Sequence, residues 1–453
     1  MGRSVFLTPV QGSSNIVPVM TKHLLLILFF SAGLLAQSKP LTIKECIDRT
    51  LSASISAKNS EQALQKAEND VAVNSAPFIP SLSARFNDTL VGYDSNSNQV
   101  PLFSFYPDTY SASLNLTYNI YNMGKDADKL LSYRKKKEEA ELDLGKAKQD
   151  AAYSATSAYY SILKAQKSLL VREAVQKQRQ ENLKLTESLY KAGMRSKSIF
   201  LNSQISLGNS DLSILDGRNS LKMAKAELNT LMGQAPEAEL EITDDIEYKQ
   251  FELTYELALE TAFKNRFEWL KLLLQKEESG ISLALSERDL LPAVSVDGSY
   301  SLALDKYARD SSVWTHKGAI DQNSSWAVSL SISYPIFDGG VNSLQAENAR
   351  ISLRVVDLQL ETLKRNMRNE VYFEWNDLAR LFSSIPVYEK QAALSKENLE
   401  ITRAKYREGS VSFLDLVDAE ANYSSNQISY YQSIYDYKAQ NVDLMRSIGL
   451  KLY

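Results

Sequence analysis

The chain of 453 residues is poor in the side chains from which most catalytic and metal sites are built. Its single cysteine, Cys46, cannot form an internal disulfide or contribute to a cluster of thiolate ligands. Of its two histidines, His23 falls in a segment that we expect to be removed, which leaves His316 alone in a polar loop at 305–325. These shortages argue against an enzyme, and we expect no metal and no cofactor.

Charge of one sign and proline are also in short supply. The 51 basic and 55 acidic residues give a net charge of −4, without the basic excess that a nucleic-acid binder shows. Only 11 prolines interrupt the chain, which leaves room for very long helices. Tyrosine, by contrast, is abundant, and its 24 residues need an explanation.

The N-terminal segment has the order of a secretory signal. Lys22 precedes the apolar run 24–35, and Ala-Gln-Ser at 36–38 offers a cleavage site. The run is about half of the ~20 residues that a membrane-spanning helix needs, and no cysteine follows it at once to carry a lipid anchor. We expect residues 1–38 to be removed on export. Met20, directly before the signal, is our hypothesis for the true start, which N-terminal sequencing of the precursor would test.

Landmarks of the first half recur in the second half at a nearly constant spacing. The early pairs are 212 residues apart (253 − 41), and the later pairs are 216 apart (340 − 124). The matched pairs are Leu41 and Leu253, Pro80 and Pro292, Gly124 and Gly340, Gly193 and Gly409, and Gly233 and Gly449. This order indicates a tandem duplication: a first repeat at 39–234, a polar linker at 235–252 and a second repeat at 253–453.

Each half contains two segments in which apolar and polar residues alternate. The segments 112–121, 294–304 and 326–336 alternate clearly, whereas 82–90 fits less well because Asp88 falls on its apolar face. About ten alternating residues are typical of a transmembrane barrel strand, although a soluble sheet with one buried face has the same pattern. The export signal and the Ser- and Asn-rich second face favour the barrel. Aromatic residues, which concentrate at membrane interfaces, lie near the predicted strand ends: Tyr93, Tyr106, Tyr110, Tyr307 and Trp314.

A membrane barrel would need more than one copy of this chain. Four strands cannot close a barrel, and an open sheet edge is not tolerated in hydrocarbon; three copies of four strands would supply twelve. We expect both strand pairs to meet in one antiparallel sheet. Its outward side chains would include Leu114, Leu116, Val296, Tyr300, Val328 and Leu330.

The remainder of each half has the character of a long helical hairpin. Residues 126–190 and 341–406 mix charged and apolar residues, and each would form a helix of about 98 Å at 1.5 Å per residue. A glycine follows each, and then a second helix of about 35 residues. Pro386 lies inside the second long helix, where the first has Leu170. We expect a bend near 383–386 and not a break, because apolar periodicity resumes at once.

The order of these elements is similar to that of the TolC family of outer-membrane efflux channels. The resemblance covers essentially the whole mature chain and is carried by Tyr-Pro-Ile-Phe-Asp-Gly-Gly at 334–340 and by the stretch 406–419, which resembles the family's second hairpin turn. It implies a mostly α protein with a membrane β-barrel: a homotrimer with a shared twelve-stranded barrel in outer-membrane lipid and a twelve-helix α-barrel through the periplasm of a diderm bacterium.

The same resemblance implies transport without catalysis. The channel would export small molecules or proteins as part of a tripartite efflux or type I secretion machine. Its partners would be a periplasmic adaptor and an inner-membrane pump that supplies the energy.

An acidic pair is the sharpest candidate site. Asp415 and Asp418 are three residues apart and would share one face of a helix. The resemblance places them in the acidic ring that constricts the family's channels. We also assign Tyr406 and Arg195 to the gate, although Arg195 departs from the family's pattern. Three copies would bring six carboxylates together, which would narrow the pore and bind cations. An ordinary solvated acidic face is the alternative.

One link of the family's gate is missing. In the family, an arginine two residues after the second-half glycine pairs with an aspartate in the first-half turn. Here these positions hold Val411 and Ile199. Arg195 instead stands two residues after the first-half glycine, and our hypothesis is that it pairs with Asp415.

The two hairpin turns have matching signals. Gly193 and Gly409 predict left-handed caps at the ends of the long helices, and Ser196 and Ser412 predict N-caps of the helices that follow. The resemblance assigns adaptor docking to these turns. The implied contacts are Tyr190, Gly193, Ser196, Gly409 and Ser412. Plain helix packing is an equal alternative for Tyr190 and for Tyr406.

A protein of another class is also compatible with the helices. An exported coiled-coil spacer or a surface adhesin would need no detergent for extraction and would conduct no ions. A trimer that resists SDS would separate the channel from these alternatives.

Overall fold

The computed structural model of the chain describes residues 40–89, 109–244, 246–289, 291–306 and 320–452. The predicted signal segment 1–38 and the candidate start Met20 lie outside these ranges. Tyr93, Tyr106, Tyr307, Trp314 and His316 also lie outside them.

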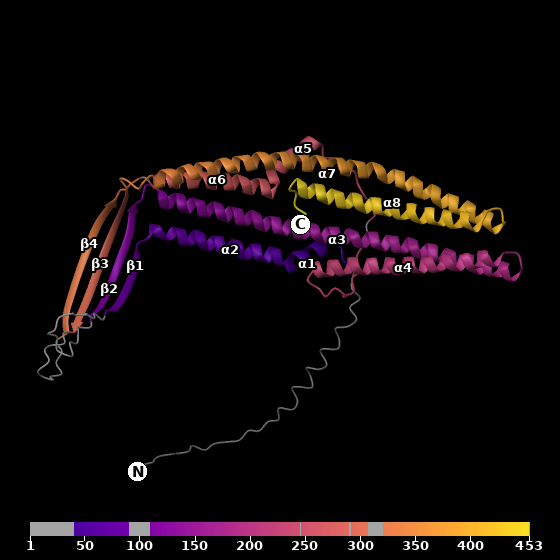
Figure 1. Cartoon of the computed structure of the whole chain (residues 1–453), viewed down its shortest axis with the longest axis horizontal. Helices are drawn as coiled ribbons and strands as arrows, with labels where there is room; N and C mark the ends of the chain where they lie inside the picture. Colours follow the sequence, from indigo (N-terminus) through magenta and orange to yellow (C-terminus); the bar gives the residue numbers. More distant parts are fainter. Residues whose placement is uncertain (1–39, 90–108, 245, 290, 307–319, 453) are drawn as a thin grey trace, which may run out of the picture.

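The described chain is mostly helical and contains one four-stranded sheet, as predicted. The first half contains α1 (Ile43–Ala53), α2 (Ile55–Ser75), the short 3₁₀ turn η1 (Ala76–Phe78), β1 (Ser81–Thr89), β2 (Thr109–Tyr121), α3 (Lys125–Lys191) and α4 (Lys197–Leu231). The second half contains α5 (Tyr255–Asn265), α6 (Phe267–Arg288), β3 (Ala293–Lys306), β4 (Ile320–Ser333), α7 (Val341–Arg407) and α8 (Phe413–Ser447). The elongated molecule carries the sheet at one end and the turns of the α3–α4 and α7–α8 hairpins at the other (Figure 1).

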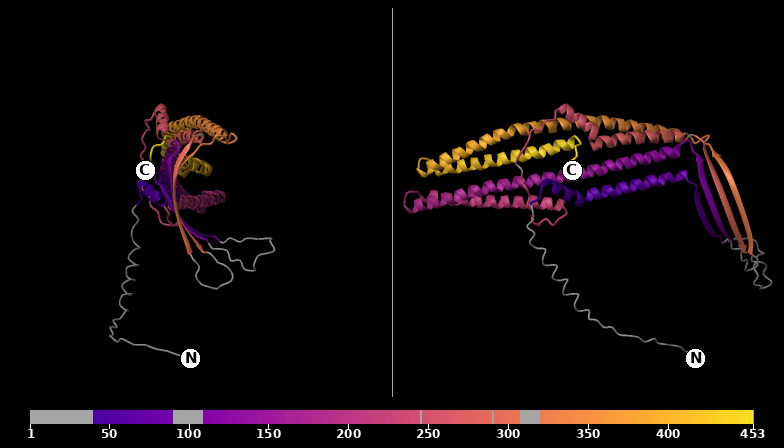
Figure 2. Two further views of the ribbon diagram at one scale, coloured as in Figure 1. Left: turned by 90° about the vertical axis from the view of Figure 1, so that its left-hand side faces the viewer. Right: turned by 180° about the vertical axis from the view of Figure 1, so that it is seen from behind.

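The sheet is antiparallel, with strand order β1-β2-β3-β4, and its register separates polar from apolar side chains. Leu114 pairs with Tyr300, and Tyr300 pairs with Trp326. Side chains in such a cross-strand row share one face, and on this face Trp326 is 77% exposed. The other face carries hydroxyls, including those of Ser301 and Ser325 at 2.7 Å from each other. The protomer alone therefore leaves a whole apolar sheet face uncovered. Figure 2 shows the strands turning away from the direction of the helices.

Equivalent helices of the two halves have equal lengths. The long helices α3 and α7 have 67 residues each, and α4 and α8 have 35 each. The long α7 passes through Pro386 without interruption and is bowed along its length (Figure 1), so the predicted absence of a break is confirmed. Ile385, next to this proline, is fully buried, and the packing of its side chain holds the helix in place there.

None of the helices in the described ranges combines the length and the apolar character that a transmembrane helix requires.

Two large apolar clusters lie in the middle of the bundle. One joins α1, α3 and α4 and includes Cys46, Ala155 and Leu228. The other joins α5, α7 and α8 and includes Met367 and Leu444. Cys46 is a small buried side chain, and burial raises the pKa of its thiol to about 11, so it stays protonated and unreactive.

The segment between the halves, predicted as a polar linker at 235–252, is bound firmly across the helices. Leu240 is buried in the first cluster. The N–H of Leu41 donates to the carbonyl of Glu241 (2.9 Å), and the N–H of Thr243 donates to the carbonyl of Leu41 (3.0 Å). The Tyr435 hydroxyl of α8 is 2.6 Å from a carboxylate oxygen of Asp244 in the same segment. The linker thus fastens the first half to α8.

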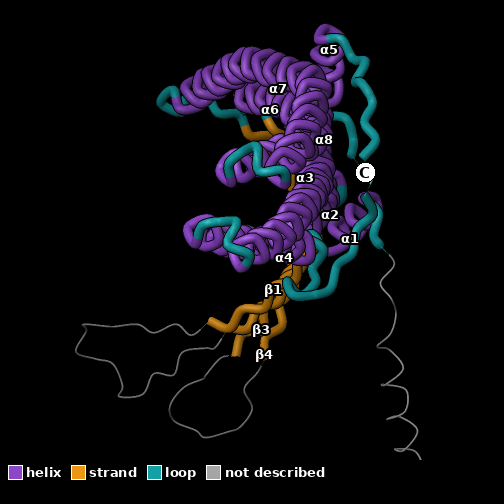
Figure 3. Tube along the Cα trace, turned by 90° about the vertical axis from the view of Figure 1, so that its right-hand side faces the viewer, coloured by secondary structure: helices purple, strands orange, loops and turns teal. Residues whose placement is uncertain are grey.

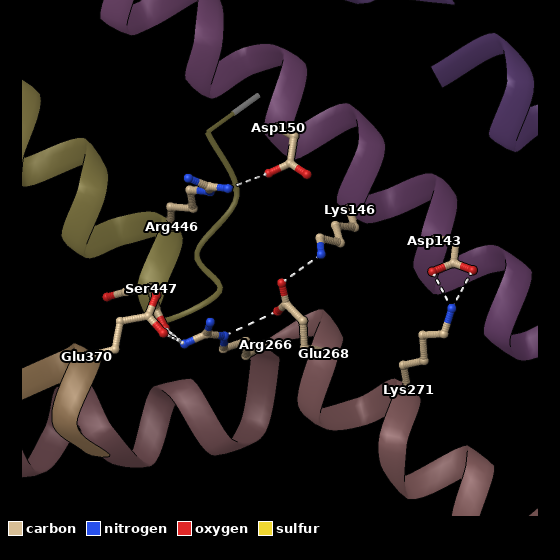
Figure 4. Close-up of polar contacts among 9 residues, drawn as sticks. All are labelled: Asp143, Lys146, Asp150, Arg266, Glu268, Lys271, Glu370, Arg446 and Ser447. Atoms are coloured by element: carbon tan, nitrogen blue, oxygen red, sulfur yellow. Dashed lines mark hydrogen bonds and ion pairs between the residues drawn. The ribbon is translucent and has the colours of Figure 1, made fainter. Parts of the chain in front are cut away.

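Ion pairs also join the halves near the middle of the bundle (Figure 4). Arg266, between α5 and α6, contacts Glu370 of α7 at 2.7 Å and Glu268 of α6 at 3.2 Å. Lys146 of α3 contacts Glu268 at 3.0 Å. Further pairs in this region are Lys271 with Asp143 and Arg446 with Asp150. The pairs of Arg266, whose side chain is mostly buried, connect α6 with α7 inside the second half. The more exposed pairs to α3 contribute about 0–1 kcal/mol each, so they mainly fix how α3 lies against the second half.

Arginine in place of Leu330 tests whether the apolar sheet face meets lipid. Leu330 pairs with Val296 on this face. Near the membrane midplane the substitution should cost roughly 2–4 kcal/mol and reduce the yield of membrane-inserted protein. The matched control is Ser331→Arg, one residue along β4 on the polar face, which should be tolerated. Equal yields of the two variants would contradict a lipid-facing sheet.

Candidate functional site at the hairpin tips

The four tip helices form a curved row. Viewed from the hairpin end, Figure 3 shows α4, α3, α8 and α7 in this order along an arc. The α3–α8 contact joins the two hairpins, and α4 and α7 occupy the two ends of the arc. The predicted site residues therefore lie on two neighbouring turns at one end of the protein.

Both long helices end in the predicted left-handed glycine. Gly193 has φ +73° and Gly409 has φ +80°. In each turn the glycine N–H donates to a carbonyl three residues back, Tyr190 (2.9 Å) or Tyr406 (3.0 Å). The N–H of the next residue donates five residues back, from Met194 to Leu189 and from Ser410 to Lys405 at 2.8 Å each. This is the Schellman arrangement, which satisfies the last helical carbonyls.

Serine begins the helix after each glycine turn, also as predicted. The Ser196 hydroxyl accepts from the N–H of Ile199 at 3.4 Å, and the Ser412 hydroxyl accepts from the N–H of Asp415 at 3.2 Å. In the second turn the Asp415 carboxylate completes a capping box by accepting from the N–H (2.8 Å) and the hydroxyl (2.7 Å) of Ser412. Both hydrogen bonds lower the pKa of the Asp415 carboxyl, and the one from the hydroxyl has the larger effect.

The acidic pair lies on an open face of α8. Asp415 and Asp418 are both exposed, and their spacing of three places them on one side of the helix. Neither carboxylate has a cationic side chain within ion-pair distance among the described residues. The charge of both residues is therefore available to solvent, to a cation or to another copy of the chain.

Arg195 does not pair with Asp415 in the protomer, and that hypothesis is wrong for this structure. Its guanidinium lies 5.2 Å from the centre of the Tyr406 ring, and Nη2 donates to the Tyr406 carbonyl at 3.5 Å. A helix C-terminus attracts a cation, and the Tyr406 carbonyl lies in the last turn of α7, which explains the choice. Arg195 thus connects the first turn to the end of α7.

The two tip tyrosines have different surroundings. Tyr406 is 1% exposed, packs against Phe413 with 6.1 Å between ring centres, and lies with its hydroxyl 3.4 Å from that of Thr186 on α3. Tyr190 is 36% exposed and stacks on Phe200 at 5.4 Å within its own hairpin. In this conformation Tyr406 packs between the two hairpins, and Tyr190 closes one turn.

A buried carboxylate that was not predicted from the sequence lies beside the acidic pair. Glu420 of α8 is 1% exposed; it accepts from Arg179 Nε at 3.2 Å and from Asn182 Nδ2 at 2.7 Å, both on α3. Burial raises the pKa of this carboxyl, against the opposite influence of Arg179. Helical spacing could have indicated its burial, because Glu420 lies four residues after the apolar Leu416 and so shares its helix face; Leu416 is fully buried.

A groove lies between the two hairpins at this level. Its volume is about 1020 Å³, and it separates α4 from the start of α8. Its lining includes Arg195, Ile199, Ile205, Phe413 and Asp415. The groove lies between the α7–α8 turn and α4, and Arg195 extends across it.

Comparison with known proteins identifies a family. A sequence model described as outer membrane efflux protein matches the chain twice, over residues 46–234 and 258–450. Outer membrane protein TolC of Vibrio cholerae is 21% identical over 415 residues, which cover 88% of this chain and 92% of that protein. The CusC structure aligns with a TM-score of 0.76 at 17% identity, covering 90% of this chain and 92% of CusC. The Campylobacter jejuni CmeC outer membrane channel aligns with the same TM-score at 15% identity, covering 90% and 85%.

Removing the two N-cap hydroxyls separately tests the Asp415 capping box. Each of Ser196→Ala and Ser412→Ala should cost about 1 kcal/mol of local stability at neutral pH. A lowered carboxyl pKa stabilises the folded tip above the unfolded value of about 3.9 and ceases to do so as pH falls through the folded value. The Ser412→Ala effect should therefore shrink in acid, whereas the Ser196→Ala effect should not, because Ile199 replaces the carboxylate there. Hydrogen exchange of the first α4 and α8 amides measures both, and equal pH profiles would refute the capping-box assignment.

Proposed function

The chain belongs to the outer membrane efflux protein family, and on that premise we propose that three copies assemble into one export channel with an acidic gate at its hairpin tips. As a member of this family it is an efflux channel protein of the outer membrane that extends into the periplasm. Three copies would supply the twelve strands of the barrel and the twelve helices of the tunnel. The cargo, small molecules or proteins, would be delivered by an inner-membrane pump.

The observation that carries the proposal is the set of surfaces that one protomer leaves without a partner. Within the described part of the chain, the outer strands β1 and β4 each have an unpaired edge, which hydrocarbon does not tolerate. At the tip, α4 and α7 end the arc (Figure 3). Large apolar side chains are exposed on α4 and on the tip half of α7, among them Ile205, Leu212, Leu215, Val387 and Leu394. A second copy placed with its α7 on this α4 would cover them, and three copies would close the ring.

We propose a tandem duplication, with repeats at 39–234 and 253–453 joined by 235–252. Support comes from the equal helix lengths and from the family model, whose two matches fall in the two repeats. Because each protomer would contribute two similar hairpins, the trimer would have approximate sixfold symmetry at the tip. The α7–α4 contact between copies would then resemble the α3–α8 contact within one copy.

The gate proposal assigns the constriction to Asp415 and Asp418. Three copies would place six carboxylates around the axis, and the capping box keeps Asp415 in one orientation with its charge retained. Arg195 and Tyr406 would hold the closed state, because Arg195 binds the end of α7 from the opposite turn. The family's usual link is thereby replaced by a contact to a backbone carbonyl and an aromatic face.

Charge removal at the acidic pair tests channel and gate together. In planar bilayers the SDS-resistant trimer should conduct, and a trivalent cation added from the periplasmic side should block it. The double variant Asp415→Asn/Asp418→Asn keeps side-chain size and removes the charge, so it should relieve the cation block with little widening of the pore. Alanine at both positions should relieve the block and also widen the pore. A double asparagine variant that is blocked as strongly as the parent would reject the ring. A parent protein that forms no trimer and no pore would favour the spacer or adhesin.

We also propose that the periplasmic adaptor docks on the two turns, at Tyr190, Gly193, Ser196, Gly409 and Ser412. Of the residues that the structure describes, none would place an atom within 4 Å of a Cβ at Gly193, and a Cβ at Gly409 would meet Arg195 Nη2 alone, at 3.8 Å. Added side chains would therefore extend into open space, where a partner would lie.

A matched pair of substitutions at Gly409 tests the docking surface. Alanine and tryptophan both incur the cost of positive φ, roughly 1–2 kcal/mol, but only tryptophan obstructs a partner. Gly409→Trp should abolish export while membrane insertion and trimer yield stay normal, and Gly409→Ala should retain export. If both variants lose the trimer, this glycine acts in folding alone.

A further inference from the structure

The buried Glu420 joins both hairpins directly behind the proposed gate. A carboxylate without solvent is costly unless it is paired and fully hydrogen-bonded, and here both oxygens have partners on α3. Glu420 Oε2 accepts from Arg179 and Oε1 accepts from Asn182. Arg179 also donates through Nη1 to the Ser206 carbonyl of α4 at 3.0 Å. One ion pair thus connects α8 with the whole first hairpin.

A second arginine lies near the same carboxylate. Burial raises the pKa of Glu420, and Arg403 of α7, like Arg179, opposes this rise electrostatically. Arg403 forms no ion pair within the described ranges, and its Nη2 is buried without a hydrogen-bond partner there. A buried donor without an acceptor costs about 1–3 kcal/mol. The site therefore contains one carboxylate and two arginines, one on each hairpin.

The hairpin fold does not itself require this ion pair. At the spacing of 216, the counterpart of Glu420 is Gln204 (420 − 216) and the counterpart of Arg179 is Ser395 (179 + 216). Gln204 is an exposed, uncharged residue of α4, and the Ser395 hydroxyl donates to the Ala392 carbonyl of its own helix at 3.0 Å. Helices of the same lengths are thus built without a charge at either position, and the ion pair serves something that only the α3–α8 junction does.

We infer that Glu420 is a positioning residue of the gate: it binds Arg179 and Asn182 when the tip is closed and exchanges them for Arg403 when the α7–α8 hairpin moves away from α3. The inference rests on the proposed channel function. Because Arg403 belongs to the moving hairpin, the buried carboxylate keeps a cation in both states. Such an exchange offers two discrete arrangements, as a switch requires, without leaving a buried charge unpaired in either.

The two arginines should have opposite effects on the channel. Arg179→Gln removes the closed-state partner, so resting conductance should rise roughly tenfold, the change expected for one lost charge-assisted hydrogen bond. Arg403→Gln removes the open-state partner, so resting conductance should stay low and export should fall. A purely structural role for the site would move both variants in the same direction. In a Glu420→Gln background, adding Arg179→Gln should change conductance little further.

Arg266→Gln is the matched control. It also removes an ion pair between elements, with Glu370 at 2.7 Å, but in the middle of the bundle (Figure 4), so resting conductance should not change. The exchange is overturned if Arg179→Gln and Arg403→Gln shift conductance in the same direction, or if neither shifts it in a channel that conducts normally. Failure of the parent to conduct would instead overturn the proposed function, so the two failures are distinguishable.

Discussion

Unpaired backbone groups at the two edges of the sheet constrain the rest of this protein. In hydrocarbon, strands β1 and β4 could satisfy their outer N–H and C=O groups only with another chain, because neither outer edge is paired within the described residues. The apolar face formed by residues such as Trp326 and Val328 favours a non-aqueous surrounding. If the sheet pairs with neighbouring copies of the chain, the helices that continue from it must contact the same copies. The curved row α4-α3-α8-α7 has this property, because its two ends expose the faces that a neighbouring copy would cover.

Apolar packing and polar contacts are unevenly distributed along the bundle. The two large apolar clusters lie in its middle, where the linker and the Arg266 ion pairs also bind. The tip cluster is small and depends on Leu399, Tyr406, Leu416 and Ala419. Close-packed apolar side chains cannot exchange neighbours without opening cavities, whereas hydrogen-bonded groups can change partners at lower cost. The end that depends on hydrogen bonds is therefore the end where movement is least costly, and the acidic pair lies there.

Features that depend on local chain geometry could be predicted from the sequence. Gly193 and Gly409 adopt the left-handed caps, Ser196 and Ser412 cap the next helices, and the alternating segments form one sheet. Partner choice across helices could not be predicted, because it depends on how two long helices are rotated against each other. Arg195 illustrates this: sequence distance allowed Asp415, but in the folded tip its guanidinium contacts the end of α7. The linker is a similar case: its composition is polar, but an apolar residue, Leu240, is buried against the helices.

Two kinds of acidic residue lie within six positions of α8, and helical phase alone separates them. Asp415 and Asp418 fall on the exposed side, whereas Glu420, four residues after the buried Leu416, falls on the side that packs against α3. These side chains share one rigid helix, so a rotation or shift of α8 that re-aims the exposed carboxylates must also displace Glu420 from Arg179. The reverse holds as well: the contact that fixes Glu420 fixes the direction of the acidic pair. Control of the proposed gate would thus require no contact with Asp415 or Asp418, because one buried hydrogen-bonded carboxylate sets the orientation of the helix that carries them.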